Sequence, residues 1–364
     1  MSKVNMDRFV KTFCELVKIS SESYNEKEFV GYLEGYFGKM DGVKTKKDSY
    51  GNLIVKIPAK NSSSKTVVGF SCHADTVKPG VGINPVVDRE EGIIKSDGKT
   101  ILGADDKAGI AAVIETVLCA EKHPPLEFII SICEEPGLFG STNMDYSLVD
   151  AKIAYLLDGE EVDKIIVGGP STVNLTASYK GIPAHAGMAP EKGISSILAA
   201  SKAISKLRLG YLDEETTANI GVIQGGEVRN GVPEHTKVQA ECRSLNHEKV
   251  IKLADEMEAI FKQGAKEVGA EVTVEKTLIY KAYLLSESSD IVKGLKKAFK
   301  KNGVETETLV IRGGTDAANH NAHGISTAVL GMGAREIHSC KEYLILKEAE
   351  VLTKTLVDIV EELA

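Results

Sequence analysis

The sequence lacks three features, and each absence excludes a class of protein. It has no dense run of Lys or Arg, and together with a formal net charge of −8 this argues against a nucleic-acid-binding surface. It has no apolar stretch that approaches the roughly 20 residues of a membrane span. Its charged, amphipathic N-terminal stretch also lacks the apolar segment of a secretory signal. The sequence therefore predicts a cytoplasmic protein with no nucleic-acid or membrane partner.

Cysteines are few and form no CxxC pair. The six stand far apart, at Cys14, Cys72, Cys119, Cys133, Cys242 and Cys340. This spacing favours small buried hydrophobic side chains in a reducing compartment over a disulfide framework.

The composition is that of an ordinary soluble globular protein. The chain has 364 residues, of which 43% are hydrophobic and 26% are charged. This length allows one large domain or two domains of ordinary size.

The two ends of the chain, residues 1–170 and 285–364, have the pattern of one α/β domain. Apolar runs of strand length alternate there with segments of helical periodicity, which predicts a mixed, mostly parallel sheet covered by helices. The expected helices are 5–19, 26–38, 106–121, 288–301 and one from about 347, and the expected strands are 53–58, 66–72, 126–133, 152–157, 307–312 and 326–332, with a loop at 313–324.

The pattern changes in the inserted segment, residues 171–284. Strands with alternating polarity replace the fully apolar runs, and two helices separate them. The expected strands are 172–180, 219–226, 236–245 and 271–280, and the expected helices are 194–207 and 246–268. This order predicts a four-strand, two-helix α+β module close to the ferredoxin-like pattern.

Seven acidic and histidine residues follow buried strands or stand where a loop enters a helix. They are His73, Asp75, Asp105, Glu134, Glu135, Asp158 and His338. Ligands of an open α/β sheet bind at the carboxyl ends of its strands, so these side chains are expected to converge. Divalent metals such as zinc bind His nitrogen and carboxylate oxygen, and a catalytic site leaves one position open.

A two-metal site assigns different tasks to these residues. Two ions about 3.5–4 Å apart, bridged by one carboxylate, activate a water and polarise a carbonyl together. Asp105 suits the bridge because it lies in a Gly-flanked loop at a helix mouth. The Pro-Gly pair after Glu135 predicts a turn, so one of Glu134 and Glu135 can bind metal while the other acts as general base. Asp75 is placed to fix the imidazole tautomer of His73.

Each feature alone has a plainer structural explanation. A buried hydrogen-bonded pair would account for His73 and Asp75, an N-cap for Asp105, and solvated turns for Glu134, Glu135 and Asp158. Their joint occurrence at strand ends favours the metal site. The remaining histidines have no spacing that links them to the cluster and are predicted not to be ligands: His123, His235, His247, His320 and His323.

Seven ordered motifs covering almost the full chain resemble the M20 metallopeptidase family, most closely its peptidase T-like branch. These are SCHADT, LGADDKAG, CEEPGLFGS, LLDGE, YKGIPAHAG, IRGGTDA and IHSCKEYL. The resemblance implies a co-catalytic di-zinc hydrolase, with Co²⁺ or Mn²⁺ as possible alternatives, in which the catalytic domain 1–170 plus 285–364 is interrupted by a lid and dimerisation domain, 171–284.

The resemblance also implies a role for each site residue. His73, Asp105 and Asp158 would hold one metal, and Asp105, Glu135 and His338 the other. Glu134 would be the general base, with Asp75 orienting His73. The family holds a cis peptide bond at the position between Asp105 and Asp106.

Four further residues are candidates for substrate contact. The resemblance implies that His185 reaches the site of the neighbouring subunit in a homodimer and stabilises the oxyanion. It also implies that Asn219 and Arg243 bind carboxylate or carbonyl groups of the substrate, and the Arg fork suits a terminal carboxylate. Arg312, beside the GGTDA loop that contains Asp316, is the fourth candidate.

The sequence predicts a metal-dependent exopeptidase acting on short peptides, an aminopeptidase or tripeptidase. True peptidase T is longer and differs at HAGMAPEKG, which leaves the preference for tripeptides open. A carboxypeptidase or an N-acyl-amino-acid deacylase would share the metal site and is the alternative enzyme. A non-catalytic metal-binding or scaffold protein is the alternative outside enzymes, and a missing ligand would favour it.

Overall fold

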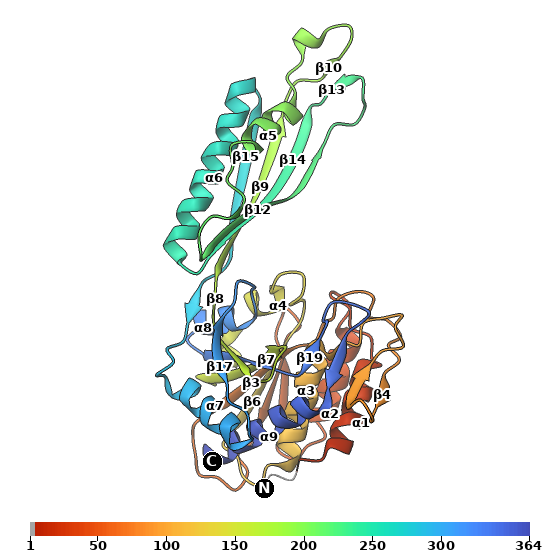
Figure 1. The fold of residues 1–364 in the computed structure, drawn as a ribbon, viewed down its shortest axis with the longest axis vertical. Coiled ribbons are helices and arrows are strands. Elements are labelled where there is room, and N and C mark those ends of the chain that lie inside the picture. The colour runs from red at the N-terminus through yellow and green to blue at the C-terminus, as the bar shows by residue number, and fades with distance from the viewer. Residues whose placement is uncertain (1–3) are drawn as a thin grey trace. The chain divides into compact units, whose positions relative to one another are not determined.

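The structure, a computed structural model, describes residues 4–364. Within them the chain forms two compact units (Figure 1). The first unit runs to Gly168 and resumes from Leu284 to Ala364, and the second is Gly169–Tyr283. The sequence predicts the corresponding boundaries at 170/171 and 284/285.

A mixed sheet forms the centre of the first unit. Its strands are β1 (Lys44–Lys47), β2 (Leu53–Ile57), β3 (Val68–His73), β6 (Leu126–Ser131), β7 (Ile153–Gly159), β8 (Lys164–Gly169), β16 (Tyr283–Leu284), β17 (Glu307–Val310) and β18 (Ser326–Gly331). Among the described residues their order is β1-β2-β6-β3-β7-β18-β8-β16, with β17 paired to β8. The central strands β6, β3, β7 and β18 are parallel, so their carboxyl ends lie at one edge.

Both faces of these central strands are buried, which explains why β3 and β6 lack the regular alternation of polar and apolar residues of a half-exposed strand. One face packs Phe70, Phe128 and Tyr155 into the main core. The other face packs Ile129 and Ala154 into a smaller cluster.

Helices cover this sheet. They are α1 (Met6–Val17), α2 (Lys27–Phe37), α3 (Ala104–Cys119), α4 (Phe139–Thr142), α7 (Asp290–Lys301), α8 (Ala317–Ala322) and α9 (Leu346–Glu362). The buried helix α3 packs on β3 and β7 and is flanked by α1 and α9. Strand β8 and helix α8 were not predicted. Helix α8 forms within the expected loop 313–324 because its side chains at 317–320 are buried against the unit.

Four short strands make a second sheet in this unit. They are β4 (Val86–Asp88), β5 (Ile93–Lys95), β19 (Ala334–Arg335) and β20 (Tyr343–Ile345), in the order β19-β20-β5-β4. Strands of two or three residues carry too little periodicity to be predicted from sequence. Strand β19 matters because it leads directly to His338.

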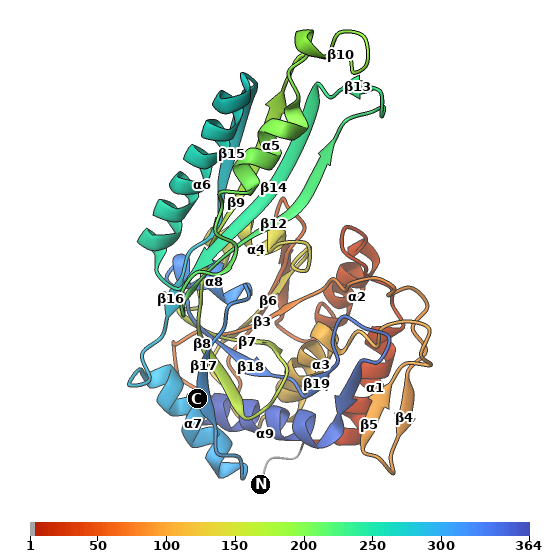
Figure 2. The same cartoon turned by 45° about the horizontal axis from the view of Figure 1, so that its top comes forward.

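The second unit is an antiparallel sheet with two helices on one face (Figure 2). Its elements are β9 (Ser171–Lys180), β10 (Ala184–His185), α5 (Ser196–Ile204), β11 (Gly210–Tyr211), β12 (Thr216–Gly225), β13 (Gly231–Val232), β14 (His235–Ser244), α6 (His247–Val268) and β15 (Glu271–Tyr280). The strand order is β11-β12-β14-β9-β15. The short strand β11 is therefore added at the edge of the four predicted strands. Alternate residues of β9 and β14 pack against α5 and α6, and the intervening residues face away from the helices.

Two general expectations can be checked on the described residues. None of the helices between residues 4 and 364 has the length and apolar character needed to span a bilayer. All six cysteines are free, as predicted. Cys72, Cys133 and Cys242 are buried, whereas Cys340 is exposed, so burial was predicted wrongly for Cys340.

Candidate active site

The predicted ligands gather at the carboxyl edge of the parallel strands. His73 is the last residue of β3, and Asp158 lies near the end of β7. Glu134 and Glu135 follow β6, Asp105 stands in the first turn of α3, and His338 follows β19. Elements far apart in the chain therefore bring these side chains into one cluster.

The Asp105 carboxylate lies between two histidines. Its Oδ1 is 3.0 Å from Nε2 of His73, and its Oδ2 is 3.1 Å from Nε2 of His338. Asp105 and Asp106 are joined by a cis peptide bond, as predicted, and both have non-helical backbone angles within α3. Each oxygen of this carboxylate thus faces a different imidazole, which is the arrangement required of a carboxylate shared by two cations.

The other acidic side chains of the cluster lie against the same two histidines. Glu135 Oε2 is 3.0 Å from Nε2 of His338, and Asp158 Oδ1 is 3.5 Å from Nε2 of His73. Ligand atoms of His73, Asp105 and Glu135 all lie within 4.8 Å of one another, as do those of His73, Asp106 and Asp158. Two oxygens in the cluster, Glu135 Oε1 and Asp106 Oδ1, are buried without a hydrogen-bond partner among the described residues. The donor set and the unpartnered oxygens fit divalent cations.

Charge complementarity dominates the electrostatics of the cluster. Burial favours the neutral form of His73, but the neighbouring Asp105, Asp158 and Asp75 outweigh it and raise the pKa of His73 well above its ordinary value. Hydrogen bonds to Asp105 and Glu135 raise the pKa of His338 to about 10. Burial raises the pKa of Asp158 to about 7, and Asp105 adds to this effect.

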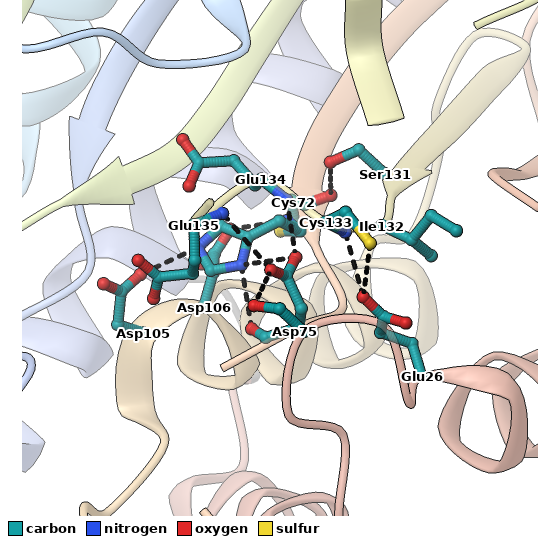
Figure 3. Close-up of polar contacts among 12 residues, drawn as sticks. Glu26, Cys72, Asp75, Asp105, Asp106, Ser131, Ile132, Cys133, Glu134 and Glu135 are labelled. Atoms are coloured by element: carbon teal, nitrogen blue, oxygen red, sulfur yellow. Dashed lines mark hydrogen bonds and ion pairs between the residues drawn. The ribbon is translucent and has the colours of Figure 1, made fainter. Parts of the chain in front are cut away.

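Glu134 differs from the other acidic residues of the cluster. It is buried, and its carboxylate makes no hydrogen bond within residues 4–364. Burial and the nearby carboxylates of Asp158, Asp316 and Glu135 raise its pKa well above the ordinary value. In Figure 3 its side chain leads away from the Asp75 carboxylate that holds its backbone N–H. Glu134 is therefore a buried carboxylate that lies beside the predicted ligands and has no hydrogen-bond partner of its own among the described residues.

Comparison with known proteins agrees with this geometry. Residues 52–168 match peptidase family M28, and residues 168–269 match the peptidase dimerisation domain of M20 enzymes. An uncharacterized Bacillus subtilis protein, YqjE, is 40% identical over 99% of this chain and 100% of its own length. The crystal structure of aminopeptidase PepT from Bacillus cereus is 38% identical, with a TM-score of 0.89 and 99% of both chains covered. The chain belongs to the M20 metallopeptidase family, in its peptidase T-like branch. A tripeptidase from Staphylococcus aureus is 32% identical, with a TM-score of 0.92 and 99% of both chains covered.

Asp75 of this M20 peptidase contacts His73 in a different way from the predicted one. The Nδ1–H of His73 donates to the main-chain carbonyl of Asp75 at 2.9 Å, while the Asp75 carboxylate lies 3.6 Å away. Because β3 ends at His73, the chain turns and directs the Asp75 carboxylate elsewhere. That carboxylate accepts the backbone N–H groups of Glu134 and Glu135, at 2.9 and 3.2 Å.

Two buried carboxylates that the sequence analysis did not single out, those of Asp106 and Glu342, accept backbone N–H groups of the predicted ligands His73 and Asp105. Asp106 Oδ2 accepts the N–H of His73 at 3.2 Å. Glu342 Oε1 accepts the N–H of Asp105 at 3.1 Å, and its Oε2 accepts those of Leu102 and Gly103. The only sequence signals for Asp106 and Glu342 are their places in the motifs LGADDKAG and IHSCKEYL.

A polar network lies behind the ligands of the M20 peptidase. The buried Asp316 carboxylate accepts the hydroxyl groups of Ser131 and Ser141. His320 Nε2 lies 2.9 Å from the Ser71 hydroxyl and its Nδ1 lies 3.0 Å from that of Tyr146, and burial lowers its pKa to about 3. Both ring nitrogens of His320 are therefore engaged away from the ligand cluster.

The four substrate-contact candidates are not part of the ligand cluster. His185 on β10, Asn219 on β12 and Arg243 on β14 belong to the second unit, where His185 and Asn219 are exposed. Asn219 lines an open groove of about 450 Å³ together with Glu241. Arg243 forms two hydrogen bonds to the Glu241 carboxylate, at 3.1 and 2.8 Å, a pairing that was not predicted. Arg312 is an exposed residue of the first unit.

Proposed function

We propose that this M20 peptidase is a metal-dependent exopeptidase that hydrolyses short peptides, with aminopeptidase or tripeptidase specificity. The observation that carries the proposal is the Asp105 carboxylate, whose two oxygens face His73 and His338 at 3.0 and 3.1 Å. The names aminopeptidase and tripeptidase carried by its two similar solved structures support the specificity.

Two divalent ions are the proposed cofactors, with zinc favoured and cobalt or manganese as alternatives. His73, Asp105 and Asp158 would hold one ion, and Asp105, Glu135 and His338 the other. The unpartnered oxygen of Glu135 supports this assignment, because a buried carboxylate oxygen without a hydrogen bond is costly unless a cation compensates it. When bound, such ions activate water and polarise the scissile carbonyl.

Glu134 is the proposed general base. It would take a proton from the attacking water and deliver it to the leaving amine, so that one carboxylate serves both halves of the reaction. Its burial beside the proposed ligands, with no hydrogen bond to its carboxylate among the described residues, supports this role. Asp75 would keep Glu134 in place through the backbone N–H and fix the His73 tautomer through its own carbonyl.

Substrate recognition is assigned to His185, Asn219, Arg243 and Arg312. Arg243 would bind a terminal carboxylate through its fork. Its pairing with Glu241 means that a substrate carboxylate would have to compete with that glutamate.

A homodimer formed through the second unit is also proposed. The match to the peptidase dimerisation domain supports it, because residues 168–269 include most of this unit. The edge of β12 offers a surface for self-pairing, since β11 pairs only with Thr217 and Ala218. The six free cysteines support the proposed cytoplasmic location.

One rate comparison tests the proposal against its alternatives. A tripeptide would be supplied free, N-acetylated and C-amidated, to enzyme loaded with zinc, cobalt or manganese. An aminopeptidase should cleave the free and C-amidated forms and leave the N-acetylated form intact. Preference for the N-acetylated form would support the carboxypeptidase or deacylase alternative. No hydrolysis of any form by the metal-loaded protein would overturn the enzymatic proposal and favour a metal-binding scaffold.

A further inference from the structure

One carboxylate oxygen of Glu26 accepts three hydrogen bonds, from two segments that are far apart in the sequence. Glu26 Oε1 accepts the N–H of Tyr24 at 2.9 Å. It also accepts the N–H of Cys133 at 3.0 Å and the thiol of Cys133 at 3.1 Å (Figure 3). Glu26 is only 4% exposed, so water cannot readily replace its carboxylate as the acceptor for these donors. The carboxylate therefore ties the segment before α2 to the residue that immediately precedes Glu134.

Both residues that donate to Glu26 have left-handed backbone conformations. Tyr24 has φ 72° and Cys133 has φ 49°. Residues other than glycine adopt this region only where their surroundings impose it, and such residues cluster at functional sites. Glu26 occupies the N-cap position of α2, yet its side chain does not cap that helix. Its carboxylate is committed to the two left-handed residues instead.

Asp75 accepts the backbone N–H groups of the two residues that follow Cys133, Glu134 and Glu135. Its Oδ1 accepts the N–H of Glu134, and its Oδ2 accepts the N–H of Glu135 and, at 2.8 Å, the hydroxyl of Ser23. Three consecutive backbone N–H groups, those of residues 133–135, therefore point at two buried carboxylates. Figure 3 shows the contacts of Glu26 and Asp75 with this turn.

The segment that supplies Ser23 and Glu26 is itself anchored beside the metal ligands. The N–H of Ser23 donates to the carbonyl of Thr76 at 3.1 Å, and the N–H of Thr76 donates to the carbonyl of Ser21 at 2.9 Å. Because Thr76 directly follows Asp75, this pairing fixes residues 21–26 relative to the carboxylate they help to orient.

We propose that Glu26 is a positioning residue for Glu134, and that residues 21–26 form a clamp that aims the general base. The backbone angles of Cys133 set the direction in which the chain enters Glu134. Without the Glu26 carboxylate, Cys133 loses the acceptor that supports its left-handed conformation, and the Glu134 side chain loses its direction. This inference rests on the proposed role of Glu134 as the base.

The test compares Glu26→Ala and Glu26→Gln with a matched control, Glu127→Gln. Glu127 is also buried, lies on β6, and accepts the backbone N–H groups of Asp150 and Ala151 at the opposite end of that strand. We expect Glu26→Ala to lower kcat about 10- to 100-fold, the usual effect of removing a group that supports an active-site residue. KM and bound metal should stay at wild-type values. Glu26→Gln should lower kcat less than Glu26→Ala, since its amide oxygen can still accept hydrogen bonds. Glu127→Gln should keep wild-type kcat.

A double variant separates positioning of Glu134 from general support of the fold. In a Glu134→Gln background there is no base to aim, so adding Glu26→Ala should cause no further loss of residual activity. An unchanged kcat in Glu26→Ala, a loss that tracks metal content, or a loss that persists in full in the Glu134→Gln background would each overturn the clamp. Wild-type turnover by Glu134→Gln alone would instead overturn the proposed base.

Discussion

The carboxylate of Glu342 accepts a hydrogen bond from the backbone N–H of Asp105, at 3.1 Å, across 237 positions of sequence. Its second oxygen accepts two more N–H groups of the same loop, each at 2.7 Å. A residue near the C-terminus therefore sets the backbone position of the carboxylate proposed to bridge both metals.

Replacing Glu342 should weaken metal binding more than it weakens the fold. We expect Glu342→Gln to raise the metal dissociation constant about 10- to 100-fold, because its amide group presents only one acceptor oxygen to three N–H groups. Metal titration followed by calorimetry measures this. The control is Glu115→Gln, a buried glutamate at the far end of α3 that accepts from Asn5 and Arg8. Equal loss of affinity in both variants would show that Glu342 has no specific effect on the site.

Replacement of Glu134 and replacement of Glu135 should have different effects on metal content, although the two residues are adjacent. Glu134→Gln should keep both metals and lose about 10²–10⁴-fold in kcat, the range typical for removal of a general base. Glu135→Gln should lose metal, since Glu135 is a proposed ligand beside His338. Metal analysis alongside steady-state kinetics separates the two. Loss of zinc from Glu134→Gln in step with activity would contradict the assignment.

Metal binding should release protons at neutral pH. Asp105 and Glu135 raise the pKa of His338 to about 10, so His338 in chelator-treated protein is protonated at pH 7 and must lose that proton to bind a cation. Affinity should therefore increase as the pH rises from about 6 towards 9, by up to about tenfold per unit for each displaced proton. Calorimetry in two buffers of different ionisation enthalpy counts the protons. Affinity that is independent of pH in this window would argue against His338 as a ligand.

If His185 contributes to the active site of the partner subunit in the proposed dimer, an inactive His185→Ala variant should be complemented by a second inactive variant. Mixed dimers of His185→Ala and Glu134→Ala would carry one site with both residues intact, so full exchange should restore about one quarter of wild-type activity. His235→Ala, which changes another exposed histidine of the second unit, should need no complementation. Failure to recover activity despite proven exchange would remove His185 from the partner's site.

Replacement by alanine should change the stability of the protein in opposite directions at two glycines. A Cβ at Gly109 would lie 2.3 Å from Asp106 Oδ1 and 2.8 Å from Leu157 Cβ, so Gly109→Ala should destabilise the protein by about 1–3 kcal/mol. A Cβ at Gly31, an exposed position of helix α2, would meet nothing within 4 Å. Gly31→Ala should therefore raise the free energy of unfolding by about 0.5–1 kcal/mol. Denaturant titration measures both. Equal stability of the two variants would contradict the tight packing of α3 on β7.

Local pattern was enough to predict the main elements and the cluster. The apolar runs before His73 and Asp158 identified parallel strands, and strands of that kind end at one edge of a sheet. Periodicity also separated the inserted unit from the α/β part. It did not predict β4, β5, β19 and β20, because strands of two or three residues leave no periodic signal.

The sequence by itself determined which side chains could bind metal, since residue chemistry and strand ends are local properties. Only the tertiary structure decided what holds them in place. Glu26, Asp106 and Glu342 act through backbone N–H groups of residues 33–237 positions away, and a backbone donor is identical in every residue except proline. No pattern of side chains marks such a donor, so its acceptor becomes visible only when folding brings the two segments together.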